Sequence, residues 1–268
     1  MDAVSPDMRR IIDARLADIA NEDEVKILLA IESGSRAWGF HSPDSDYDVR
    51  FIYARPVDWH LGLEKKRDVV ERPIDDELDF SGWDIGKALT LALGSNAVVA
   101  EWLQSPIVYA AHPEFIKDLT EFCATVLDRK SVSWHYLSLY ARQEKRARLD
   151  DGQIQLKRYF YMIRPILALR WMRITSAPMP PMDMANLCAG ADLSFAQQDA
   201  LDGLTEQKKA ISERGQVGAS VPILDELMRE EESLTRAWLQ SAEPNKAKPD
   251  HWAVASDLNR KYVRMAGI

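Results

Sequence analysis

The sequence predicts an α+β protein in which a small mixed-sheet domain is followed by an all-helical domain. Short apolar runs rich in branched residues, typical of buried strands, occur only in the first hundred residues. From Ser95 onward, apolar residues recur at helical spacing. We therefore expect a mixed-sheet domain over residues 1–108 and a helical domain over 109–268.

The first domain is expected to alternate helices and strands. Apolar residues at helical spacing predict a helix over 7–20, which ends at Asn21-Glu22-Asp23. Ser81-Gly82-Trp83-Asp84 is expected to be a turn, with Asp84 as N-cap of a helix over 85–93. Apolar runs and alternation predict four short strands, at 25–31, 47–53, 68–71 and 77–80.

Helical spacing dominates the remainder of the chain. Breaks are expected at residues 150–152, at 177–181 and at 243–246, where Gly, Pro and polar residues interrupt the apolar pattern. The expected helices cover 96–104, 113–127, 132–149, 153–173, 195–212, 221–241 and 249–265.

The composition is that of a globular protein, because 46% of the residues are hydrophobic and 28% are charged. The start lacks a basic region followed by an apolar stretch, and no run of about 18 apolar residues occurs. We expect a soluble, cytoplasmic protein without a membrane partner. The two cysteines, Cys123 and Cys188, lack the spacing of a zinc site and argue against a disulfide scaffold.

The net charge of −8 argues against wrapping a long nucleic-acid duplex. The charge is nevertheless uneven, because residues 142–173 contain nine Lys or Arg and three Asp or Glu, an excess of +6. An RNA of modest size is therefore a possible partner of this segment. A solvated helix face is the alternative for its basic residues Arg142, Lys145, Arg146 and Arg148.

The loop between the first two expected strands carries the clearest chemical pattern. Asp46 and Asp48 are two residues apart at the entry to a strand, so both side chains reach the same face. Neighbouring carboxylates repel each other, and Mg²⁺ commonly bridges such a pair to substrate phosphates. A solvated turn is the alternative, since Ser42-Pro43-Asp44-Ser45 has turn composition.

Two-metal chemistry requires a third carboxylate. Asp79, between Leu78 and Phe80 in an expected strand, is the best candidate, and Glu77 on the same face is its rival. This acid would bind metal and accept the proton of the incoming hydroxyl. Asp84 is interpreted as a helix cap and His41 as a loop residue.

Gly34-Ser35 follows directly on the first expected strand. Glycine permits close approach of the backbone to a phosphate, and Ser35 would offer N–H groups and a hydroxyl. Arg36 adds positive charge nearby. Together with a later strand aspartate, this pair at fixed spacing favours a phosphate-transfer site over a solvated turn.

Gly34-Ser35, ten residues and then Asp46-Tyr47-Asp48 resemble the Gly-Ser-x10-Asp-x-Asp signature of the minimal nucleotidyltransferases in the DNA polymerase beta-like superfamily. The wider text is similar to the RNA-ligase-associated predicted nucleotidyltransferases, or YcgL family, over roughly residues 25–175. Further matching stretches are Leu78 to Asp84, Lys87, Ser95-Asn96, Glu101 to Leu103, Ser105 to Tyr109 and Lys157 to Pro165.

The resemblance implies a nucleotidyltransferase domain in the first half of the chain. By resemblance, Asp46 and Asp48 bind Mg²⁺ (or Mn²⁺), Asp79 is the third carboxylate, and Gly34 and Ser35 hold the nucleotide phosphates. The implied reaction transfers a nucleoside monophosphate from an NTP, such as ATP, and releases pyrophosphate. The resemblance leaves the acceptor open.

Lys157, Tyr161 and Arg164 are spaced i, i+4 and i+7 and therefore share one helix face. A cationic clamp on nucleotide phosphates is one interpretation, with Lys157 at the β- and γ-phosphates. A surface face whose long stems cover apolar neighbours is the other. The resemblance favours nucleotide binding for Lys157 and Tyr161.

The leading hypothesis is an enzyme that adds NMP to RNA, such as a tRNA or an end awaiting repair. The alternative is a toxin- or antitoxin-type nucleotidyltransferase that modifies a protein hydroxyl. A non-catalytic nucleotide-binding module is the third, which the presence of all three carboxylates disfavours.

Overall fold

The structure is a computed structural model that describes residues 3–64, 66–74, 77–147, 153–210, 217–241 and 248–267. The breaks expected at 150–152 and 243–246, and Arg148, lie outside these residues. Packing divides the chain into two compact units. Unit 1 comprises residues 1–37, 46–127 and 246–268, and unit 2 comprises 38–45 and 128–245.

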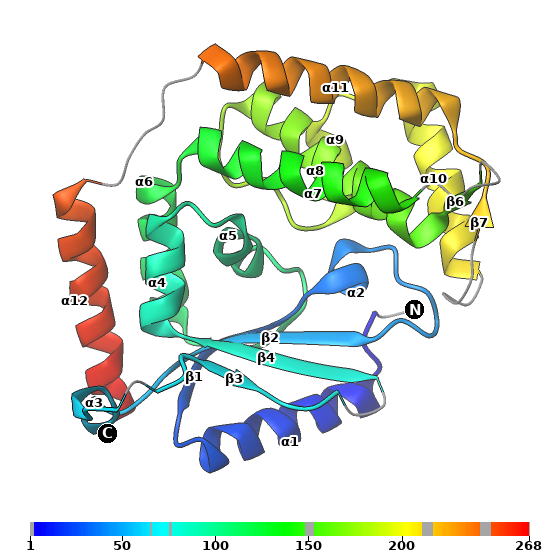
Figure 1. The fold of residues 1–268 in the computed structure, drawn as a ribbon. Coiled ribbons are helices and arrows are strands. Elements are labelled where there is room, and N and C mark those ends of the chain that lie inside the picture. The colour runs from blue at the N-terminus through cyan, green and yellow to red at the C-terminus, as the bar shows by residue number, and fades with distance from the viewer. Residues whose placement is uncertain are drawn as a thin grey trace. The chain divides into compact units, whose positions relative to one another are not determined.

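Unit 1 is built on a five-stranded mixed sheet (Figure 1). Its strands are β1 (Lys26–Glu32), β2 (Tyr47–Ala54), β3 (Val69–Glu71), β4 (Leu78–Asp84) and β5 (Val108–Ala111). They lie in the order β3-β4-β2-β1-β5, where β2 and β4 are parallel and the other neighbours antiparallel. The mixed-sheet fold predicted for the first half of the chain is confirmed.

The sheet has two differently covered faces. Helix α1 (Pro6–Glu22) lies along one face, where Ile12, Leu16 and Ile19 pack with Val49 and Phe51 in a buried cluster (Figure 1). Since side chains alternate along a strand, Asp48 and Arg50 of β2 lie on the opposite face. We call the face with Asp48 and Arg50 the polar face, after these two residues at the start of β2; Ile52 and Ala54, further along the strand, are buried on the same face.

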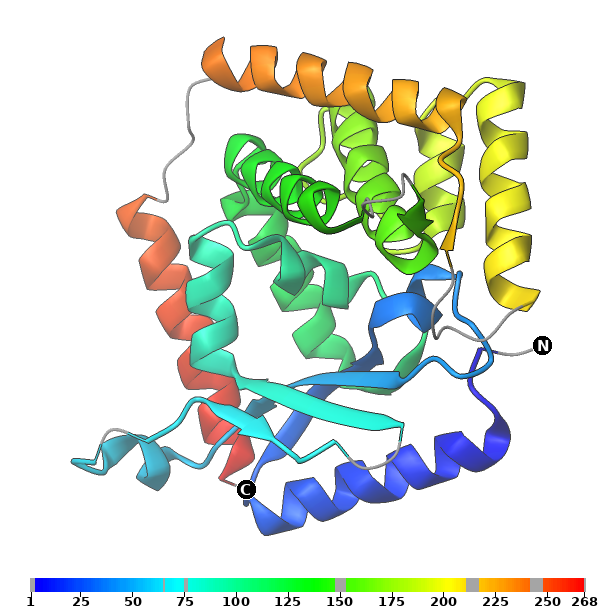
Figure 2. The same ribbon diagram turned by 45° about the vertical axis from the view of Figure 1, so that its right-hand side comes forward.

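The remaining helices of unit 1 follow the strands. Asp84 caps α4 as predicted, because its carboxylate accepts a hydrogen bond from the Gly86 N–H at 2.8 Å. Helix α12 runs beside α4 and α6 (Figures 1 and 2), so that a late segment of the chain packs onto the sheet unit. These helices are α2 (Gly34–Trp38), α3 (Val57–Leu61), α4 (Ile85–Leu93), α5 (Ala97–Leu103), α6 (Pro113–Val126) and α12 (Pro249–Ala266).

The turn expected at Ser81 to Asp84 is wrong, because β4 continues through these residues and pairs with β2 as far as Asp84. Gly82 has a packing reason to be in a strand. A Cβ at this position would lie 2.1 Å from Cε2 of Phe51, so only glycine leaves room for the phenylalanine ring.

Strand β5 and helix α3 were not expected from the sequence. Strand β5 has only four residues and pairs with β1 at the sheet edge, where His112 N–H also donates to the Leu28 carbonyl at 2.9 Å. Its residues show no alternation of apolar and polar side chains, so the sequence pattern could not identify it.

Unit 2 is predominantly helical, as expected. Its helices are α7 (Arg129–Ala147), α8 (Leu156–Thr175), α9 (Met184–Gly190), α10 (Phe195–Ala210) and α11 (Pro222–Ser241). Helix α8 packs against α7, α9 and α11 and is almost wholly buried in its middle. The unit also contains a two-stranded pair, β6 (Ile154–Gln155) and β7 (Val217–Gly218).

The observed division falls at 127/128, whereas the expected boundary was 108/109. β5 joins the sheet and α6 packs on β1, which keeps residues 109–127 with the first unit. The loop of residues 38–45 belongs to unit 2, where Phe40 stacks on Phe160 at 4.7 Å between ring centroids. In the part of the chain that the structure describes, none of the helices combines the length and apolarity needed to cross a membrane.

Candidate active site

The polar face of the sheet begins at the junction of β1 and α2. Ser33 N–H donates to the Asp48 carbonyl at 2.8 Å, which ties the end of β1 to β2. Gly34 follows with φ +61°, and a Cβ there would lie 1.9 Å from Oδ2 of Asp48. Glycine is therefore required at position 34 both by backbone conformation and by the close approach of a carboxylate.

Asp48 and Asp79 are direct neighbours on parallel strands. β2 and β4 pair in a register that sets Asp48 opposite Asp79, and both side chains lie on the face away from α1. Each side chain is about 30% exposed, at 30% for Asp48 and 29% for Asp79. The structure thus brings together two of the three predicted carboxylates.

Arg50 joins these two carboxylates. Its Nη2 donates to Oδ1 of Asp48 at 2.9 Å and to Oδ2 of Asp79 at 2.7 Å. Its Nη1 donates to the Asp79 carbonyl at 2.9 Å and to the Val49 carbonyl at 3.1 Å. One guanidinium therefore provides the positive charge beside a pair of like charges.

Asp46 lies in the loop immediately before β2 and is exposed. In the residues with described positions, no group of three or more His, Cys, Asp or Glu side chains is arranged to hold a metal ion. The donor chemistry of Asp48 and Asp79 nevertheless suits Mg²⁺, because adjacent, partly exposed carboxylates supply the hard oxygen ligands that this ion takes. The residues present fit the ion by ligand type.

Glu32 is a fully buried carboxyl group behind Asp48. Its Oε1 accepts the Asp48 N–H at 2.8 Å, and its Oε2 accepts the Tyr109 hydroxyl at 2.6 Å. Burial raises the pKa of Glu32 to about 7, against the lowering effect of these two hydrogen bonds, and the Asp48 charge raises it further. Glu32 thereby positions the backbone of Asp48 from inside the sheet.

Ser35 and Arg36 in α2 are both buried. Arg36 donates through Nε to the Asp46 carbonyl at 3.1 Å and through Nη1 to the Ala3 carbonyl at 2.9 Å. Its guanidinium also lies 3.6 Å from the centre of the Tyr47 ring. These contacts favour a role for Arg36 in fixing the loop before β2, where nucleotide binding had been predicted.

The three predicted residues of α8 have different surroundings within unit 2. Lys157 is exposed and, with Tyr161, lines a hollow of about 280 Å³, which is also lined, among the described residues, by Gln143, Gln155 and Arg158. Arg164 is buried, its Nε donates to the Met182 carbonyl at 3.0 Å, and its guanidinium lies 4.5 Å from the Trp38 ring centre. The contacts of Arg164 are thus those of a core residue.

Three residues of these surroundings were not singled out from the sequence. Arg50 could have been found, because it is two positions after Asp48 and therefore on the same face of the strand. Arg158 lines the hollow beside Lys157, and its Nη1 reaches Gln143 at 3.4 Å. Glu32 gave the weaker signal of an acid at the end of an apolar run.

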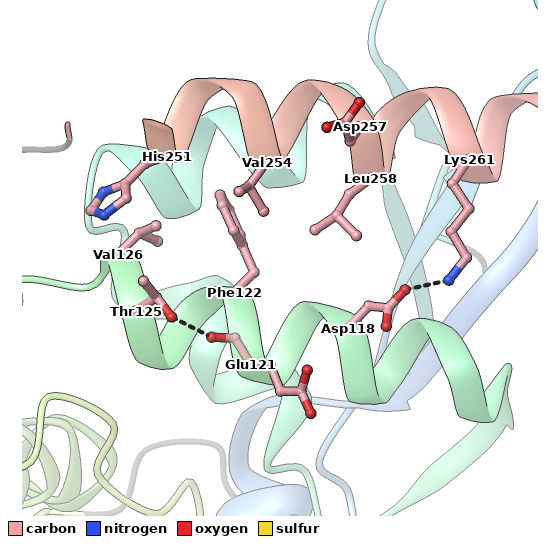
Figure 3. Close-up of a pocket in the computed structure, with 10 residues that line it drawn as sticks. All are labelled: Asp118, Glu121, Phe122, Thr125, Val126, His251, Val254, Asp257, Leu258 and Lys261. Carbon is pink, nitrogen blue, oxygen red and sulfur yellow. Dashed lines mark hydrogen bonds and ion pairs between the residues drawn. The ribbon is translucent and has the colours of Figure 1, made fainter. Parts of the chain in front are cut away.

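A second hollow, of about 390 Å³, lies between α6 and α12 in unit 1 (Figure 3). Apolar side chains of Phe122, Val254 and Leu258 point into it, and Lys261 contacts Asp118 at 2.6 Å at one end. None of the predicted site residues lines this hollow.

The chain is similar to known proteins over most of its length. The uncharacterized protein YcgL of Bacillus subtilis (strain 168) is 36% identical over 256 residues, which cover 94% of each chain. A crystal structure of a nucleotidyltransferase-like protein from Exiguobacterium sibiricum 255-15 aligns with 86% of this chain and 75% of that one, at 11% identity and a TM-score of 0.29. A family model described as the RNA repair pathway DNA polymerase beta family matches residues 8–261, which confirms the resemblance and extends it beyond residue 175. The chain belongs to the RNA repair pathway DNA polymerase beta family.

Proposed function

We propose that this protein transfers a nucleoside monophosphate from an NTP to a hydroxyl group of RNA in a reaction that depends on Mg²⁺ or Mn²⁺. The observation that carries the proposal is the in-register pairing of Asp48 with Asp79 next to Gly34. The chain belongs to a polymerase beta family whose description names an RNA repair pathway, and this membership supports both the reaction class and the RNA acceptor.

In the proposed reaction the acceptor hydroxyl oxygen attacks the α-phosphorus of the NTP. The bond from the α-phosphorus to the oxygen that bridges to the β-phosphorus breaks, and pyrophosphate leaves with that electron pair. Asp79 accepts the hydroxyl proton, which its partly exposed carboxylate on the polar face allows. Asp48 and Asp79 would hold a divalent ion, which when bound would supply positive charge to the transferring phosphoryl group.

The protein environment contributes position and charge. Gly34 leaves the space that the Asp48 carboxylate occupies, and Glu32 holds the Asp48 N–H from behind. Preorganised groups of this kind contribute strongly to phosphoryl transfer, since the enzyme acts chiefly by positioning and charge stabilisation. In unit 2, we assign the hollow with Lys157 and Arg158 to phosphate groups, because both of these cations are among its described lining residues.

The test is incorporation of each labelled NTP into total RNA and total protein in the presence of Mg²⁺. Label in RNA is expected, and Asp48→Asn should reduce its rate at least roughly 10²-fold. Asp68→Asn is the matched control, because Asp68 lies in the same unit but pairs with Lys87 outside the site. Label in protein alone would assign a protein hydroxyl as acceptor. Absence of label with every NTP would refute the proposal.

A further inference from the structure

The guanidinium of Arg50 is fixed on four sides. It donates to two carboxylates, those of Asp48 and Asp79, and to two carbonyls, those of Val49 and Asp79. The side chain is only 20% exposed. An arginine side chain that extends into solvent would not make this set of contacts. The Arg50 side chain therefore has a defined position on the polar face.

The position of Arg50 follows from the strand itself. Because side chains two residues apart share a face, Arg50 stands next to Asp48 on β2, and β4 brings Asp79 to the other side of the same Nη2. Two carboxylates side by side destabilise each other unless a cation lies between them. In this protein the guanidinium of Arg50 is that cation.

We propose that Arg50 is a resident counter-ion of the Asp48 and Asp79 carboxylates, which holds the pair together before a divalent ion binds and lowers the affinity of the pair for that ion. This inference rests on the proposed function, because it concerns the same carboxylates. It goes further, because it assigns to Arg50 the role of weakening metal binding when no nucleotide is bound.

The competition has two physical sources. Each carboxylate gives one oxygen to Arg50, so a divalent ion has to share or replace these contacts. The guanidinium also repels the ion, and for charges of +1 and +2 at about 5 Å in a water-like dielectric this repulsion weakens binding about tenfold. The anionic triphosphate of an NTP offsets this repulsion, so ion and nucleotide are expected to bind together.

The test compares Mn²⁺ affinity of the full chain, measured by electron paramagnetic resonance of free Mn²⁺, in wild type, Arg50→Met and Arg72→Met. Arg72 is a matched control, because its Nη2 also contacts two carboxylates, those of Glu22 and Asp23, and its side chain is also 20% exposed. Arg50→Met should bind Mn²⁺ about tenfold more tightly than wild type, and Arg72→Met should bind it as wild type does.

A second measurement is urea unfolding with EDTA or with Mn²⁺. Arg50→Met should be less stable than wild type in EDTA and should gain more from Mn²⁺ than wild type gains. The inference is overturned if Arg50→Met binds Mn²⁺ no more tightly than wild type while Asp48→Asn loses binding. That result would still support the metal site of the proposed function. Absence of Mn²⁺ binding in every variant would instead remove the metal centre of the proposed function, and the inference with it.

Discussion

Glu32→Gln should change how the stability of the protein depends on pH. Glu32 is fully buried, and burial raises its pKa from an ordinary 4.5 to about 7. A carboxyl group whose pKa is higher in the folded state favours folding while it is protonated. Its stabilising effect is therefore complete below about pH 4.5 and is lost as the pH rises to about 7.

The size of the effect follows from this difference in pKa. At about 1.4 kcal/mol per pKa unit, wild type should lose roughly 2–3 kcal/mol of unfolding free energy between about pH 5 and pH 8 through Glu32 alone. Glutamine should not show this loss, because it carries no charge. It keeps an oxygen for the Asp48 N–H, and its amide can donate to the Tyr109 oxygen that now donates to Glu32.

The assay is urea unfolding of both proteins at a series of pH values, read as the difference between their unfolding free energies. Tyr109→Phe serves as the companion variant. The Tyr109 hydrogen bond lowers the pKa of Glu32, so its removal should extend the loss of stability to higher pH. This extension should disappear in the Glu32→Gln background. Parallel pH profiles for wild type and Glu32→Gln would show that Glu32 does not titrate in this range.

Two further predictions concern residues that the sequence analysis assigned to nucleotide phosphates, one in each unit. Gly34→Ala should lower the unfolding free energy by roughly 2–4 kcal/mol and abolish NMP transfer, because it combines positive φ with a clash against Asp48. Gly39→Ala also has positive φ but open space at the Cβ, so urea unfolding should show a loss of only about 1 kcal/mol. Equal losses would contradict the proposed clash. Lys157→Met should raise KM for NTP about tenfold with kcat little changed, and Arg236→Met in the same unit should leave steady-state kinetics unchanged. An unaltered KM in Lys157→Met would remove the hollow from substrate binding.

The sheet was largely predictable because its central strands carry strong local patterns. The apolar runs at 25–31 and 47–53 correspond to β1 and β2, and both belong to the buried core. The end of β4 was not predictable, since Ser81 and Gly82 are turn formers by composition. Gly82 is in a strand because of the Phe51 ring, a contact between residues 31 positions apart that periodicity cannot reveal.

Within the candidate site, local sequence patterns anticipated where some of the residues lie in the fold. Asp48 lies at the start of β2, Asp46 lies in the loop directly before it, and Asp79 lies on the neighbouring strand β4. The contacts of Arg36 and Arg164 depend on tertiary packing and could not be predicted. Arg36 and Arg164 were both expected at phosphates, yet both are buried against backbone carbonyls and aromatic rings.

Helix α12 has a consequence for the order in which the protein can mature on the ribosome. Its Lys261 pairs with Glu114 at 2.7 Å, and its Tyr262 packs on Phe115 and donates to Asp118 at 2.7 Å. All of unit 2 is translated before α12 emerges, so the sheet acquires this helix only after the helical unit has been synthesised. Unit 1, which is translated first, is thus completed only when α12 has been synthesised. A nascent chain paused before residue 249 would expose the surfaces of α4 and α6 that α12 covers.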